Sequence, residues 1–173
     1  MNKEQFRAMQ APLKEKYRQD PGVALATIRA TGRASTGLAF TVESPRGPIE
    51  AGPHPAAGGD GTLANAEEML LEALVACSGV TLQSVATAWG VELRHARIVA
   101  EGDVDQRGTL AISKDVPVGF REIRLRFELD ADASPEKLDK VVEIAERYCV
   151  VFQTLSQPTT ITATRAPYDS DKP

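Results

Sequence analysis

The chain contains two cysteines, Cys77 and Cys149, and these are its strongest candidates for nucleophilic or redox chemistry. Neither belongs to a CxxC motif, and neither lies in a cluster of histidines and carboxylates at ligand spacing. A permanent disulfide is not expected in a reducing cytosol. The two thiols are therefore either packing residues or a redox couple, and their sequence positions leave both alternatives open.

The first cysteine, Cys77, lies in the stretch that we expect to form the centre of the fold. Residues 65–90 form the longest run with helical character, and the run is apolar on nearly every side, which predicts a buried central helix ending at Gly90. A bare cysteine on such a helix most often packs, and burial raises the pKa of a thiol, so a reactive Cys77 needs a cation beside it. The helix and its entrance loop contain no Lys or Arg, so the candidates lie upstream at Arg29, Arg33 and Arg46.

Helix geometry sorts the three glutamates of this stretch. At about 100° and 1.5 Å per residue, Glu68 and Glu72 lie about 180° and 140° from Cys77 around the axis and point elsewhere. Glu67 lies about 80° away but roughly 15 Å along the axis, too far to bond the thiol directly. It could hold an arginine that extends toward Cys77, or it could simply complement the positive end of the helix dipole.

The remaining patterns predict an α+β domain with largely antiparallel strands. An amphipathic helix over residues 2–19, with Phe6, Met9, Leu13 and Tyr17 on one face, ends at Asp20-Pro21-Gly22. Ser134 and Pro135 mark the start of a second amphipathic helix, whose inward face includes Cys149. We divide the chain into an N-terminal helix (1–20), one domain (21–166) and a polar tail (167–173). Strands are expected at 23–30, 37–43, 47–51, 93–105, 123–129 and 159–164, with turns at TGRASTG and SPRG.

Composition excludes several classes of protein. A length of 173 residues suits one domain, and a net charge of −4 argues against nucleic-acid binding. His54 and His95 are isolated, so no metal site is expected. No run of 18 apolar residues and no signal peptide is present, so the default is a cytoplasmic protein that does not bind membranes.

Three motifs resemble those of a known superfamily. GGDGTLANAEEMLLEALVACSGVTL is similar to the core signature of the osmotically inducible protein C (OsmC) and organic hydroperoxide resistance (Ohr) superfamily, and it matches at Asn65, Glu67 and Cys77. ATGRASTG resembles the turn that carries the catalytic arginine, here Arg33, and AERYCVVFQTL resembles the stretch holding the partner cysteine, here Cys149. The resemblance covers residues 24–164. Ala66 and Val150 stand where the family often has proline.

The resemblance implies an OsmC-like fold in an intertwined homodimer with active sites at the subunit interface. It also implies a thiol-dependent peroxidase that needs no bound cofactor. Cys77 would attack an organic hydroperoxide, assisted by Arg33 and Glu67, and form a sulfenic acid. Cys149 would resolve that acid as a disulfide, which an external dithiol of the lipoyl type would reduce. Arg29 is the alternative to Arg33. The alternative functions are thiol chemistry on another electrophile and a non-catalytic dimer that binds a small apolar ligand.

Overall fold

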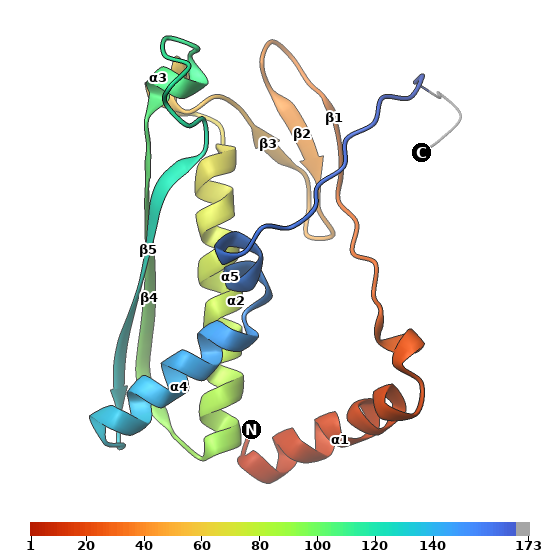
Figure 1. Ribbon diagram of the computed structural model, residues 1–173, viewed down its shortest axis with the longest axis vertical. Coiled ribbons are helices and arrows are strands. Elements are labelled where there is room, and N and C mark those ends of the chain that lie inside the picture. Colours follow the sequence, from red (N-terminus) through yellow and green to blue (C-terminus); the bar gives the residue numbers. More distant parts are fainter. Residues whose placement is uncertain (169–173) are drawn as a thin grey trace.

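The computed structural model describes residues 1–168 and shows a mixed α+β chain whose strands are paired antiparallel (Figure 1). This confirms the predicted fold class. In chain order the helices and strands are α1 (Lys3–Gln19), β1 (Thr31–Ala34), β2 (Phe40–Glu43), β3 (Ile49–Ala51), α2 (Ala66–Trp89), β4 (Leu93–Val104), α3 (Gln106–Thr109), β5 (Phe120–Ala131), α4 (Pro135–Tyr148) and α5 (Val150–Ser156).

The packed part of the molecule, residues 66–156, holds the hydrophobic core. The long β4–β5 hairpin lies on one side of α2, and α4 crosses α2 on another (Figure 1). Side chains from α2, the following loop and α4 form one buried cluster, and partly buried side chains of β4 and β5 pack against it. The buried members of the cluster are Leu82, Val85, Ala86, Val91, Val141 and Ala145.

Helix α2 begins and ends as its sequence predicts. The Asn65 side chain accepts a hydrogen bond from the Glu68 backbone N–H at 2.9 Å, and this satisfies one of the free donors of the first turn. Gly90 ends the helix with a φ of 64°, a left-handed conformation that glycine adopts without strain.

The central helix is only partly covered by its own chain. Leu70 and Trp89 are exposed and Val80 is 71% exposed, whereas the prediction was a helix buried all round. The difference arises because β4, α4 and α5 leave part of the helix surface free, and α1 touches only its C-terminal half. By length and apolar character α2 could also cross a membrane, a property shared by core helices of soluble proteins.

The open part, residues 3–51, consists of α1 and the three-stranded meander β1–β2–β3, which Figure 1 shows reaching away from α2. The sheet is joined to the start of α2 by a bridge between Ala51 and Ala64 and by a 2.8 Å hydrogen bond from the Gly52 N–H to the Ala64 carbonyl. Helix α1 is amphipathic as predicted, yet Met9, Leu13 and Tyr17 on its apolar face are exposed. Much apolar surface of the open part is therefore uncovered within one chain.

Two expected strands differ in the structure. The strand predicted over residues 23–30 is wrong: Pro21–Ala24 form a short 3-10 helix and residues 25–30 are irregular and exposed. Strand β1 instead lies in the predicted turn TGRASTG, and the turn is confined to residues 35–39 around Gly37. Residues 159–164 are not a strand: no neighbouring strand pairs with them, and Ile161 is 88% exposed. β-branched composition predicts extended backbone but does not provide a partner for it. Of the predicted polar tail, residues 169–173 lie outside the described part.

Candidate active site

The structure places Cys149 beside Cys77, although the two cysteines are far apart in the sequence. Cys77 lies near the middle of α2 and is partly exposed, whereas Cys149 is completely buried at the joint between α4 and α5. Both thiols are free. A reagent from solution can therefore reach Cys77, while Cys149 is accessible only to groups inside the protein.

A break in the helix positions the second thiol. Cys149 ends α4 and also caps α5, with extended backbone at φ −78° and ψ 109°. Its Sγ accepts a hydrogen bond from the Phe152 backbone N–H at 3.4 Å and lies 3.4 Å from the Ser78 Oγ on α2. The predicted helix containing Cys149 is therefore two helices, and the turn between them presents the thiol to α2.

The protein lowers the pKa of Cys77 below that of an ordinary cysteine. Burial acts in the opposite direction and raises this pKa. Hydrogen bonding from the Val151 backbone N–H, the Cys149 side chain and the Val150 backbone N–H outweighs burial, because these groups stabilise the thiolate. The Thr81 hydroxyl contributes least, since it donates at 2.8 Å to the Cys77 carbonyl oxygen. The donors are thus mainly backbone groups at the start of α5.

Within one chain, the predicted arginine does not meet the thiols. Arg33 lies on β1, its side chain is 67% exposed, and its charged partner is Glu43 on β2 at 3.8 Å. Arg29 lies in the exposed segment before β1. The β1–β3 sheet is attached near the start of α2 and not beside Cys77, so within one chain Arg33 does not lie next to this thiol.

Glu67 lies in the first turn of α2, away from the cysteine pair. It lines a pocket of about 420 Å³ together with His54, Asn65 and Asp103. The structure therefore brings Cys77 and Cys149 together but does not join Glu67 or Arg33 to them. Within residues 1–168, no group of three or more His, Cys, Asp or Glu side chains could hold a metal ion.

A second, mainly apolar cavity of about 600 Å³ lies between α2, β5 and α5. Leu70 and Leu74 of α2 face Phe152 and Leu155 of α5 across it. Glu146 supplies a carboxyl to its wall, and burial raises the pKa of that carboxyl. The cavity suits a small apolar molecule, whose usual binding volumes are of this size.

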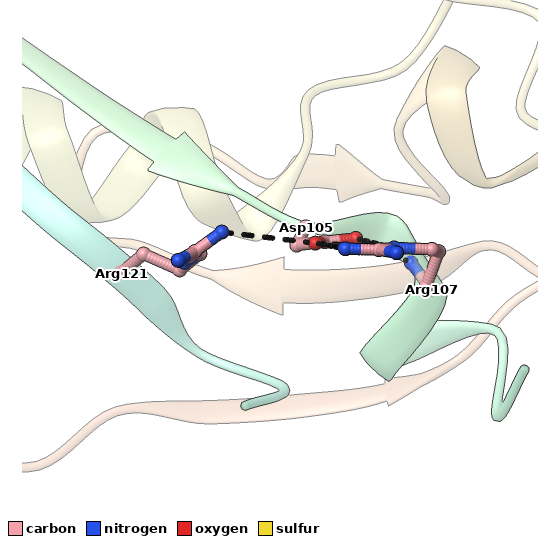
Figure 2. A network of polar contacts seen from close by, with 3 residues as sticks. All are labelled: Asp105, Arg107 and Arg121. Carbon is pink, nitrogen blue, oxygen red and sulfur yellow. Dashed lines mark hydrogen bonds and ion pairs between the residues drawn. The ribbon is translucent and has the colours of Figure 1, made fainter. Parts of the chain in front are cut away.

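An ion-pair network fixes one rim of this cavity. Asp105, whose side chain is 16% exposed, accepts hydrogen bonds from the Arg107 guanidinium, and Arg121 lies 3.9 Å from its other side (Figure 2). Hydrogen bonding from the Arg107 side chain lowers the pKa of Asp105 to about 2. The carboxylate thus stays charged at physiological pH, and Arg121, its weaker partner, lines the cavity edge.

The sequence model of the OsmC-like protein family matches residues 59–164, more than half of the chain. The chain belongs to the OsmC-like family. The matched range contains both cysteines, α2 and the β4–β5 hairpin. The family model therefore matches the packed part and does not extend to the β1–β3 sheet. The comparison with curated protein sequences gives no match.

Solved structures support the same fold. An OsmC-like protein from Mycoplasma pneumoniae is 19% identical, with a TM-score of 0.65 over 76% of this chain and 88% of that one. An OsmC-like protein of unknown function from Vibrio cholerae is 15% identical, with a TM-score of 0.62 over 75% and 94% of the two chains. The organic hydroperoxide resistance protein OhrB of Bacillus subtilis is 22% identical, with a TM-score of 0.52 over 74% and 89%.

Sequence reasoning missed several groups around the thiols of this OsmC-like protein. The backbone donors of Val150 and Val151 follow from the break between α4 and α5, which no standard capping residue signals, because cysteine is not a usual N-cap. The two β-branched valines after Cys149 are weak helix formers and are the one available hint. Ser78 was not singled out, since a serine beside a cysteine on an apolar helix carries no distinctive signal.

Proposed function

We propose that this chain is a thiol-dependent peroxidase that reduces organic hydroperoxides to alcohols. The observation that carries the proposal is the pairing of a partly exposed Cys77, whose pKa is lowered, with a completely buried Cys149 beside it. Reversible thiol redox cycling needs a reactive thiolate and a resolving thiol, and the exposure of the two cysteines gives each a different role.

The chemistry takes place in two steps at these sulfurs. The Cys77 thiolate attacks one peroxide oxygen; the O–O bond breaks, an alcohol leaves after protonation, and Cys77 becomes a sulfenic acid. The Cys149 sulfur then attacks the sulfenic sulfur; an S–S bond forms and water is released. An external dithiol, of the lipoyl type in our proposal, returns both thiols by disulfide exchange. No bound cofactor takes part.

We further propose that the chain acts as a homodimer in which Arg33 of a partner subunit reaches Cys77. Within the described residues Arg33 is exposed and its charged partner is Glu43, while part of α2 is uncovered. A guanidinium close to the thiolate would stabilise it further and could contact the peroxide. Glu67 would orient that arginine, and Arg29 is the alternative cation.

The apolar cavity supports a substrate with a hydrocarbon group. Leu70 and Cys77 are seven residues apart, so on a straight helix they point within about 20° of each other and are separated by roughly 10 Å along the axis. A hydroperoxide with its apolar part against Leu70 and Leu74 would direct its peroxide group toward Cys77. The same cavity favours an alternative function, non-catalytic binding of a small apolar ligand. Thiol chemistry on another electrophile is the other alternative.

The deciding experiment adds cumene hydroperoxide to the reduced protein and follows the mass of the chain. An intramolecular Cys77–Cys149 disulfide, detected as the loss of two hydrogens, is the expected product. Unmodified thiols after excess hydroperoxide would rule out the peroxidase and favour the ligand-binding alternative. We place the protein in the cytoplasm, where dithiol reductants are available, and keep the division into residues 1–20, 21–166 and 167–173 as a prediction.

A further inference from the structure

The Ser78 hydroxyl has an unusual partner for a serine inside a helix. Two other hydroxyls of α2, those of Thr81 and Ser84, donate at 2.8 Å to the carbonyl oxygen four residues earlier, the common arrangement in helices. Ser78 is 1% exposed, and within the described residues its hydrogen bond goes to the Sγ of Cys149 at 3.4 Å. A buried hydroxyl without a partner is costly, so this contact also fixes where the serine side chain points.

The surroundings of Cys149 give this contact a chemical consequence. Cys149 is 0% exposed, so bulk solvent does not reach its sulfur. Among residues 1–168, its neighbours with hydrogen-bonding capacity are the Phe152 N–H, the Ser78 hydroxyl and Cys77. Either Ser78 or Cys149 can donate while the thiol keeps its proton. Once that proton leaves, the Cys149 sulfur can only accept, so Ser78 becomes the donor of this pair.

We propose that Ser78 is a positioning residue for the resolving step, which holds the Cys149 sulfur beside Cys77 and stabilises the charge that develops there. The inference rests on the proposed peroxidase function. In this step the Cys149 sulfur attacks the Cys77 sulfenic sulfur, the S–S bond forms and the S–O bond breaks. The departing hydroxide takes up the Cys149 proton as water. Ser78 keeps its own proton, and no oxidant besides the hydroperoxide is needed.

The test separates the two steps in the full chain. Wild type and Ser78→Ala are mixed rapidly with cumene hydroperoxide, quenched with an alkylating reagent and analysed by mass at several pH values. Oxidation of Cys77 should change less than disulfide formation in Ser78→Ala, because Ser78 contacts Cys149 and the Val150 and Val151 amides still stabilise the Cys77 thiolate. Disulfide formation should slow about tenfold, since a hydrogen bond to a developing charge is lost. The pH profile of that step should move to higher pH, and Cys77 should over-oxidise to the sulfinic acid.

Two further variants separate positioning from simple packing. Ser84→Ala removes a hydroxyl from the same helix that bonds only a carbonyl oxygen, and it should resolve like wild type. Ser78→Thr keeps the hydroxyl and should restore the rate of disulfide formation. If Ser78→Thr has a lower melting temperature than wild type, its added methyl group disturbs packing. The rate and pH profile of disulfide formation in Ser78→Ala then decide between positioning and packing.

The results distinguish this inference from the proposed function. Disulfide formation at the wild-type rate in Ser78→Ala overturns the inference and leaves the peroxidase standing. A slower step with an unchanged pH profile also overturns it, because lost packing alone would have that effect. If wild-type Cys77 is not oxidised at all, the peroxidase proposal itself fails, and the inference fails with it.

Discussion

The packed part and the open part of this molecule differ in how far their apolar side chains are buried within one chain. In the packed part, residues 66–156, side chains of α2 and α4 close a core, and the cysteine pair is assembled within one chain. In the open part, residues 3–51, the sheet and most of α1 leave apolar side chains uncovered, and Arg33 faces solvent. The comparison teaches that one chain is enough to bring the two cysteines together, whereas the proposed activating cation depends on assembly.

The largest effect should come from the thiols of the packed part. Replacing Cys77 by serine should reduce hydroperoxide consumption to background, because the nucleophile is removed. Cys149→Ser should complete one reduction and then stop, with Cys77 over-oxidised, since no resolving thiol remains. Turnover assays with mass analysis of each variant give the answer. Sustained turnover by Cys77→Ser would show that the packed part does not hold the reactive group.

The next effect tests whether the open part serves the other subunit. Arg33→Ala should slow Cys77 oxidation about 100-fold, the usual loss when a charge-stabilising donor is removed. Mixed with Cys77→Ser by unfolding and refolding together, it should regain about a quarter of wild-type activity, because half of the random dimers contain one complete site. Arg29→Ala is the matched control and should behave like wild type. If mixing restores nothing, the arginine does not act across subunits.

A third prediction compares the stability of the two parts. Leu82→Ala should lower the free energy of unfolding by about 3 kcal/mol, because Leu82 is fully buried and truncation leaves a cavity. Ile28→Ser should raise the dimer dissociation constant about tenfold and leave chain packing intact, because Ile28 is 93% exposed within one chain. Denaturant titration measures the free energy of unfolding, and sedimentation at several protein concentrations measures the dimer dissociation constant. A wild-type monomer at micromolar concentration would mean that no second copy covers the open part.

The smallest effect concerns the pKa of Cys77. The lowered pKa predicts that alkylation of Cys77 reaches half its maximal rate at a lower pH than for an ordinary cysteine, since the thiolate fraction rises earlier. Val150→Pro should move that half-point upward, because it removes one backbone donor. The fold should tolerate the change, since Cys149 already has the extended backbone that precedes a proline. An unchanged half-point would mean that the Val150 N–H does not stabilise the thiolate.

Local sequence patterns predict most of the packed part correctly. The end of α2 at Gly90 and the start of α4 at Ser134 follow from local chemistry, because a cap needs only its own neighbours. The strand expected at 159–164 failed for the opposite reason, since extended residues become a strand only with a partner. The resemblance pointed to the two cysteines, whereas the Ser78–Cys149 contact depends on how two distant helices meet.

The joint at Cys149 also places backbone amides against both sulfurs, where NMR can follow the state of the thiols. The Phe152 amide donates to the Cys149 sulfur, and the Val150 and Val151 amides stabilise the Cys77 thiolate. Amide protons report sensitively on the charge and bonding of the atom they face. These three amide signals in a nitrogen-15 NMR spectrum should therefore act as built-in reporters of the thiol, sulfenic and disulfide forms, with no label placed on either cysteine.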